Sequence, residues 1–311
     1  MLHKKLLYLL VPVAFYLLLN IVFNHFFYYD NFGKINYTHN LFPEHNEIFD
    51  VVVTGNSQPA RAIDFALIDS LNGLNVAMGS QSVDFDYEML NAFEDNFTEK
   101  TIVLLTLTFF SFCDQFSGSN RRYDPFFETD RSLTDRIIES YFPLVGFERT
   151  STSIRNTLNY ILDDQNLDVD DTRLYPYSYD ISLWEIDGLR RYEGHKSRAL
   201  CDEELFNNHW QLIEKIITTN QEKGRQVYIL TVPYHYTYFD NLINDEQMNA
   251  LFYERIELLT MQFNIQHLDY SKDERFYNNI NYFRDWDHMN SYGAEKFTKI
   301  LIDDLLKLSP E

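Results

Sequence analysis

Five short apolar runs constrain the fold of this 311-residue chain more than any other feature. Those with mostly apolar residues, of which the first is the clearest, lack the polar alternation of a strand with one face in water. Such runs predict strands that are buried on both faces, as in a parallel sheet. In chain order they are "FDVVVTG" from Phe49, "LNVAM" before Gly79, "KTIVLLTLTFF" from Lys100 to Phe110, "QVYILTVPYH" after Gly224 and "IQHLDY" from Ile265.

Stretches with the apolar spacing of helices separate several of these runs. They cover residues 86–97, 203–221, 245–263 and 291–308. Either Asn290 or Ser291 can cap the last of them. Strands that alternate with helices form βαβ units, so we expect an α/β domain with a mostly parallel sheet and helices on both faces.

The chain divides into an N-terminal apolar segment over residues 1–29, an aromatic-rich linker over residues 30–48 and the α/β domain over residues 49–311. Within that domain, residues 112–200 are polar and show no clear alternation. A structureless loop of this length is unusual. We therefore interpret it as an insertion with some helix, which covers the carboxyl edge of the sheet.

The apolar segment "LLYLLVPVAFYLLLNIVFNHFF" follows Lys4-Lys5. It is about long enough to cross a bilayer core, which takes roughly 20 helical residues. It lacks the small residues of a signal-peptidase site, so we predict an uncleaved anchor over residues 1–29. The positive-inside rule then gives a single-pass protein of the cell membrane, with a cytoplasmic N-terminus and residues 30–311 outside the cytoplasm. A buried helix of a soluble protein and a cleaved signal peptide are the alternatives.

The acidic composition limits the partners of this protein. It has 47 acidic and 26 basic residues, and its formal charge is −21. The field of such a protein repels phosphates, so we expect no nucleic-acid partner. The two cysteines, Cys113 and Cys201, have no metal-like spacing. They either form one disulfide outside the cytosol or are two buried thiols.

Two short motifs carry the residues of a candidate active site. The first apolar run stops at Gly55-Asn56-Ser57, and "DWDH" near the C-terminus places Asp285 three residues before His288. A serine hydroxyl needs a base to remove its proton, and the base needs a group to orient it. The spacing lets the Asp285 carboxylate reach Nδ1 of His288, which leaves Nε2 free for Ser57. Asp287 is expected to project elsewhere.

These motifs resemble those of the SGNH (GDSL-like) hydrolase superfamily. "TGNSQ" after a strand is similar to its first block, and "DWDHMNSYGA" is similar to its Asp-x-x-His block. The resemblance covers about residues 48–110 and 203–305. It implies a three-layer, flavodoxin-like fold in which Ser57 is the nucleophile, His288 the base and Asp285 the orienting acid. It also implies an oxyanion hole formed by the backbone amides of Ser57 and Gly79.

One block departs from the superfamily pattern. The third block supplies a side-chain oxyanion donor from Gly-x-Asn, whereas the third strand here continues into "TLTFFSFCDQ". With its single anchor, the chain is similar to membrane-tethered SGNH-like proteins that work beside membrane-bound O-acyltransferases. We therefore expect an extracytoplasmic serine esterase or O-acyltransferase that acts on acyl esters of a cell-envelope or exported glycan. Its partners would be the acyl donor or acylated glycan and, through the anchor, an O-acyltransferase. No cofactor is implied.

The missing asparagine also supports a second hypothesis. In it, the domain is a catalytically inactive glycan-binding or assembly subunit of a membrane acylation complex. The serine, the histidine and the aspartate that occur together favour the enzyme instead.

Other residues carry weaker signals. His235, at the end of the fourth strand, either contacts substrate or is a hydrogen-bonded histidine in an aromatic wall. The pairs Arg121-Arg122 and Arg190-Arg191 either recognise a carboxylate or are solvated. Asp285, Asp287 and His288 together could bind a divalent cation, but the sequence has no second ligand cluster, so we predict no metal.

Overall fold

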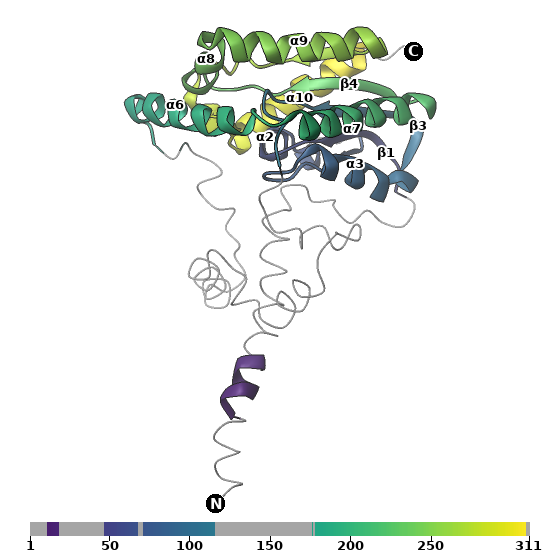
Figure 1. Ribbon diagram of the computed structural model, residues 1–311, viewed down its shortest axis with the longest axis horizontal. Helices are drawn as coiled ribbons and strands as arrows, with labels where there is room; N and C mark the ends of the chain where they lie inside the picture. The colour runs from purple at the N-terminus through teal and green to yellow at the C-terminus, as the bar shows by residue number, and fades with distance from the viewer. Residues whose placement is uncertain (1–10, 19–46, 68–70, 116–175, 177, 309–311) are drawn as a thin grey trace, which may run out of the picture. The chain divides into compact units, whose positions relative to one another are not determined.

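The computed structural model describes residues 11–18, 47–67, 71–115, 176 and 178–308. Its centre is a five-stranded, all-parallel sheet with the strand order β2-β1-β3-β4-β5 (Figure 1). The strands are β1 (Phe49–Thr54), β2 (Gly73–Asn75), β3 (Phe97–Thr106), β4 (Gln226–Thr231) and β5 (Gln266–Asp269). The α/β class and the parallel sheet predicted from the apolar runs are confirmed.

The central strands are buried on both faces, as their continuous apolar runs predict. Val51, Val52 and Val53 of β1 have no exposed surface, although successive side chains of a strand point to opposite faces. Val52 pairs with Val103 of β3 in a parallel register. Only helices on both sides of the sheet can bury such a strand.

The second strand is shorter than its sequence run predicts, because the regular ladder stops at Asn75. The Asn75 side chain accepts the amide of Ala77 and donates to backbone carbonyl oxygens of the segment after β1. The chain nevertheless continues along β1. The amide of Val76 donates to the Val53 carbonyl at 2.9 Å, and the amide of Met78 donates to the Gly55 carbonyl at 3.1 Å. These contacts carry Gly79 to the end of β1.

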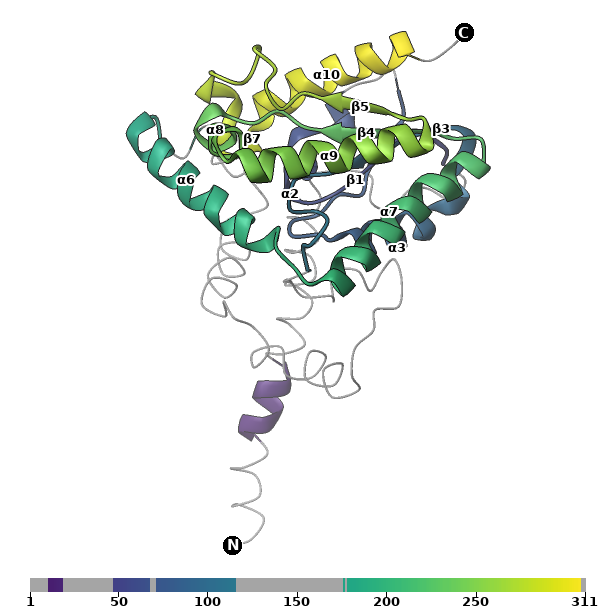
Figure 2. The same ribbon diagram turned by 45° about the horizontal axis from the view of Figure 1, so that its top comes forward.

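Helices cover both faces of the sheet (Figure 2). Parallel connections are right-handed, and the strand order reverses at β1, so the helices after β1 and after β2 lie on opposite faces. On one face α3 packs against α7 and α7 against α9, while α10 packs against α2 on the other. The helices are α2 (Ser57–Ala62), α3 (Val83–Ala92), α6 (Ile181–Arg198), α7 (Glu203–Glu222), α8 (Tyr236–Asn244), α9 (Glu246–Phe263) and α10 (Ser291–Leu308).

The predicted anchor lies mostly outside the described residues, as does the linker up to residue 46. Residues 11–18 are helical. Within the described ranges, no helix is both long enough and apolar enough to span a bilayer. The anchor therefore stays a prediction.

The insertion over residues 112–200 is described at its two ends. Its C-terminal part forms α6, which agrees with the prediction of some helix there. Cys113 and Cys201 form a disulfide with a Cα–Cα distance of 5.4 Å, so the alternative of two free thiols is wrong. The bridge closes a loop with a sequence separation of 88 residues, and this loop coincides with the insertion.

Helix α6 is fixed to the rest of the domain by close packing and by ion pairs. A Cβ at Gly188 would lie 2.2 Å from the Thr237 carbonyl oxygen of α8, so only glycine permits this approach. Lys196 Nζ lies 2.5 Å from Asp245, and Arg198 Nε donates to Asp114 at 2.6 Å. The helix therefore has a defined position over the carboxyl ends of the strands.

Removal of the disulfide is expected to destabilise the domain. When the bridge that closes a loop of this size is removed, the domain is expected to lose roughly 2–5 kcal/mol of stability, because the unfolded chain gains entropy. The C113S/C201S variant should therefore unfold at lower urea concentration than the parent, as measured by circular dichroism. A variant that unfolds at the parental urea midpoint would show that packing and ion pairs hold α6 without the bridge.

Candidate active site

The nucleophile candidate Ser57 is presented by a tight turn at the end of β1. Gly55 has a φ of 131°, and a Cβ there would lie 2.8 Å from Pro59 Cγ, so the turn requires glycine. Asn56 then caps α2, because its side-chain oxygen accepts the Gln58 amide at 2.9 Å. Ser57 is the first residue of α2 and is half-buried.

The base candidate His288 lies in a small antiparallel hairpin, β6 (Phe283–Asp285) and β7 (His288–Met289), just before α10. The Asp285 carboxylate accepts the backbone amide of His288 at 3.1 Å, which fixes the loop between the two strands. Asn290 caps α10 by accepting the Gly293 amide at 3.0 Å, so of the two predicted caps Asn290 is the correct one.

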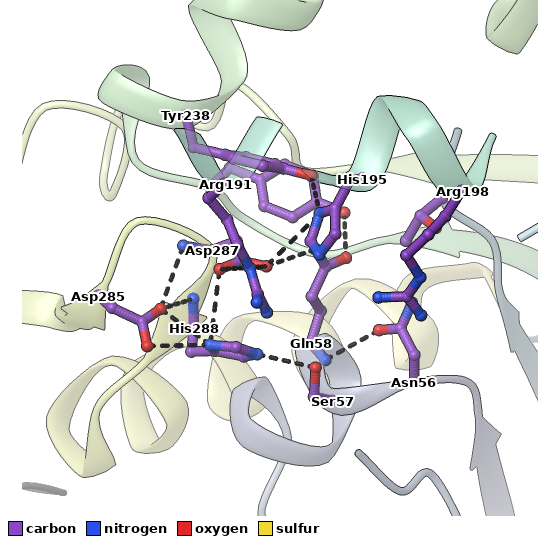
Figure 3. A network of polar contacts seen from close by, with 12 residues as sticks. Asn56, Ser57, Gln58, Arg191, His195, Arg198, Tyr238, Asp285, Asp287 and His288 are labelled. Carbon is purple, nitrogen blue, oxygen red and sulfur yellow. Dashed lines mark hydrogen bonds and ion pairs between the residues drawn. The ribbon is translucent and has the colours of Figure 1, made fainter. Parts of the chain in front are cut away.

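Ser57, His288 and Asp285 form a connected triad (Figure 3). Ser57 Oγ lies 2.8 Å from His288 Nε2. On the far side of the ring, Nδ1 lies 2.8 Å from Asp285 Oδ1 and 3.1 Å from Oδ2. A carboxylate at Nδ1 keeps the proton there, so Nε2 is free to accept the serine proton. The geometry is that of a serine nucleophile with an oriented base.

Asp287 also faces the imidazole, so the expectation that it projects elsewhere is wrong. The hairpin turns its side chain inward, where it has no exposed surface. Asp287 Oδ1 lies 3.5 Å from His288 Nδ1. His288 therefore has two carboxylates on its Nδ1 side: Asp285 at hydrogen-bond distance and Asp287 slightly farther away.

Buried Asp287 has three partners from two other elements, α2 and α6. Gln58 Nε2 donates to it at 3.0 Å, and Arg191 Nε of α6 donates to it at 3.2 and 3.3 Å. His195 Nδ1 lies 3.9 Å away. Burial acts to raise the pKa of Asp287, but the charges of His288 and Arg191 outweigh it and hold that pKa below its usual range. Asp287 is therefore an anion at neutral pH.

A neutral histidine and a tyrosine complete this network. Burial lowers the pKa of His195 to about 3, so the ring is uncharged at neutral pH. Its Nδ1 lies 2.6 Å from the Tyr238 hydroxyl. On the other side, the Tyr234 hydroxyl donates to the Gln58 side chain at 2.7 Å. Gln58, the residue after the nucleophile, is thus held at both ends of its amide.

Gly79 lies beside the nucleophile. A Cβ at Gly79 would be 3.9 Å from Ser57 Cβ. The next residue, Ser80, has a φ of 57°, an uncommon left-handed conformation for a residue other than glycine. This turn brings the Gly79 backbone close to Ser57. An oxyanion hole formed by the backbone amides of Ser57 and Gly79 requires the two residues to lie side by side in this way.

The buried carboxylate of Asp86 supports the turn that precedes Ser57. Asp86 of α3 accepts the Gly55 amide at 2.8 Å and the Gln81 side chain at 2.6 Å. Burial raises the pKa of Asp86 to about 7, although both hydrogen bonds act to lower it. Asp86 thus ties the turn before Ser57 to the segment after Gly79.

The third strand ends in buried aromatic residues instead of the amide donor of the third block. Phe110 packs against His195 with ring centroids 4.2 Å apart, and the Arg198 guanidinium lies 5.1 Å from the Phe110 ring. Thr108 and Ser111 hydrogen-bond to each other at 2.9 Å. The segment after β3 therefore packs against α6 and supports it.

His235 is buried in the aromatic core beside α8. It is 1% exposed and caps α8 through Thr237. Its ring packs against Trp184 and Phe283, and burial lowers its pKa to about 4. The alternative of a hydrogen-bonded histidine in an aromatic wall is confirmed. Arg121 and Arg122 lie outside the described residues.

Asp285, Asp287 and His288 also have the residue types of a metal site. Ligand atoms of the three lie within 4.8 Å of one another. However, the Arg191 guanidinium already binds the Asp287 carboxylate, and a cation there opposes a divalent metal ion. The donor set therefore fits a charge-paired triad better than a metal centre.

No protein-family model and no curated protein matches this chain. The site is therefore interpreted from its own geometry. Sequence reasoning missed Asp287 as a partner of His288 and missed His195 as a part of the site. It named Arg191 as a possible carboxylate-binding residue but did not identify Asp287 as the carboxylate. One signal was available: Arg191, His195 and Arg198 have the spacing of a single helix face.

The elevated pKa of Asp86 predicts a specific dependence of stability on pH. Between about pH 4 and pH 7 the unfolded chain has lost the Asp86 proton while the folded chain keeps it, so the folded state binds more protons. This group's contribution to stability therefore falls as the pH rises through that range. The unfolding free energy of the parent should therefore fall relative to that of D86N as the pH rises from 4.5 to 7.5, as measured by urea titration. A pH-independent difference would contradict the assignment.

Proposed function

We propose that this protein is a serine esterase or O-acyltransferase that works through a Ser57–His288–Asp285 triad. The observation that carries the proposal is the pair of short contacts on the His288 ring, with Ser57 Oγ at Nε2 and Asp285 at Nδ1. Two segments 231 residues apart in sequence meet there in the geometry that activates a serine hydroxyl. A binding subunit has no need of this arrangement.

The reaction follows from the positions of these atoms. Ser57 Oγ attacks the carbonyl carbon of an ester while its proton moves to His288 Nε2. The bond to the leaving alcohol then breaks, and His288 returns the proton to that alcohol. The resulting acyl-enzyme is attacked by water in an esterase or by a sugar hydroxyl in a transferase, while a proton of the attacking water or hydroxyl moves to His288 Nε2. The bond between the acyl carbon and Ser57 Oγ then breaks, and His288 returns the proton to Ser57 Oγ. Asp285 stabilises the imidazolium formed in each half.

The oxyanion of each tetrahedral intermediate needs preorganised donors. The amide of Ser57 and the amide of Gly79, on the turn beside it, supply two of them in this proposal. Each such donor is worth roughly 3–4 kcal/mol where measured in other hydrolases. The absence of the third-block asparagine leaves this hole with fewer side-chain donors than the superfamily pattern has.

The SGNH-like fold and the envelope location are parts of the same proposal. The strand order β2-β1-β3-β4-β5 is that of flavodoxin-like sheets, which supports the three-layer SGNH-like fold. The Cys113–Cys201 disulfide supports an extracytoplasmic domain, because such bridges persist in oxidising compartments. With the predicted anchor, these features favour acyl esters of a cell-envelope or exported glycan as substrates.

A fluorophosphonate probe tests the nucleophile. The full-length parent should be labelled on Ser57, and S57A should not be labelled at all. H288N should be labelled roughly 10³-fold more slowly, because the base is lost. S111A is the matched control: Ser111 follows the end of β3 and its hydroxyl hydrogen-bonds to Thr108, outside the triad, so labelling should be unchanged. Labelling of S57A at the parental rate would contradict the proposal.

A further inference from the structure

The proposed mechanism does not use the buried carboxylate of Asp287. This carboxylate lies 3.5 Å from His288 Nδ1 and also accepts from Gln58, the residue after the nucleophile. Its counter-charge comes from another part of the chain. Arg191, 96 residues earlier, reaches it from α6 of the insertion (Figure 3).

We propose that Arg191 and Asp287 are a positioning pair, through which the insertion helix sets the basicity of His288 and the orientation of the Ser57 turn. This inference rests on the proposed triad but goes beyond it. The insertion becomes a part of the catalytic machinery instead of only a cover over the sheet.

The two members of the pair act on the imidazole with opposite signs. The Asp287 anion favours the imidazolium, so it makes His288 a stronger base. The Arg191 cation offsets that charge and also holds the carboxylate in place. Because the carboxylate is fully buried, little water screens its charge, whereas the Arg191 side chain is 35% exposed and water screens the cation more, so the effect of Arg191 is the smaller of the two.

Gln58 links the pair to the nucleophile. Its amide nitrogen donates to Asp287 and its amide oxygen accepts from Tyr234, so the side chain can adopt only one orientation. Gln58 directly follows Ser57 in α2. A displaced Asp287 would therefore disturb both partners of the Ser57–His288 hydrogen bond.

Other titratable or charged groups near His288 are constant between the variants proposed below. Asp285 lies on the hairpin itself, and His195 of α6 is neutral at neutral pH. Burial raises the pKa values of Tyr234 and Tyr238 well above 10, so both hydroxyls stay protonated. Arg198 is paired with Asp114. The remaining variable charges are those of Arg191 and Asp287.

The experiment measures the titration midpoint of the His288 ring-proton resonance in the full-length chain. D287N should lower the midpoint by roughly one pH unit, and R191M should raise it by a smaller amount, because the Arg191 side chain is partly exposed. Labelling by the fluorophosphonate at pH 7 should fall up to about tenfold in R191M and recover at higher pH. R190M is the matched control, because Arg190 is exposed and pairs with Asp187 on the outer side of the same helix.

A double variant keeps the test valid if a single variant fails to fold. D287N/R191M removes both charges of the pair together, which destabilises the fold far less than leaving the buried carboxylate unpaired. The titration midpoint of the double variant should lie between those of the two single variants and within roughly half a pH unit of the parental midpoint. Shifts of D287N and R191M in the same direction, or shifts no larger than that of R190M, would overturn the pairing.

The two proposals can fail separately. If the parent is not labelled but the midpoints move in opposite directions, the positioning pair is correct and the nucleophile is wrong. If Ser57 is labelled but the midpoints do not diverge, the triad stands without help from α6.

Discussion

A charge buried away from water must be compensated, and the Asp287 carboxylate imposes this constraint on the whole site. It lies among four elements: the β6–β7 hairpin that carries it, α2 through Gln58, α6 through Arg191 and His195, and α8 behind them through Tyr238. Each of these contacts brings together segments that are distant in sequence. A buried pair of this kind contributes little net stability, but it penalises every arrangement in which a partner is missing. It therefore specifies one geometry for the site.

The strands and the triad could be predicted from the sequence because their signals are local. The apolar runs of β1 and β3 need only their own residues to indicate burial on both faces, and Gly55 indicates a turn that only glycine can make. Asp285 and His288 are three residues apart, so their contact follows from spacing. Ser57 lies at the carboxyl end of β1, where functional groups of a parallel sheet collect. His288 lies in a separate hairpin, so its contact with Ser57 is predicted from the two motifs together and not from the sheet topology.

The rest of the site depends on tertiary contacts, and no local sequence pattern predicts these contacts. Asp287 lies in the turn between β6 and β7, in a hairpin whose ladder is irregular between Phe283 and Asp285, and no spacing rule predicts its inward orientation. Arg191 lies in a polar stretch whose helix is fixed by Gly188, by the Arg198–Asp114 ion pair and by a disulfide. These contacts join α6 to α8 and to the segment after β3, so a residue at position 191 cannot be assigned to the site before its helix has a position.

The separation of the two halves of the triad has a consequence for the timing of synthesis. Ser57 precedes His288 by 231 residues, and the five strands of the sheet all lie before the β6–β7 hairpin that carries His288. The hairpin contacts α2 and α10 and does not extend the five-stranded sheet. A growing chain can therefore form its sheet while Ser57 still has no imidazole beside it. In the proposed mechanism the serine gains its base only when this hairpin docks, so a chain that stalls before His288 carries a serine without a base.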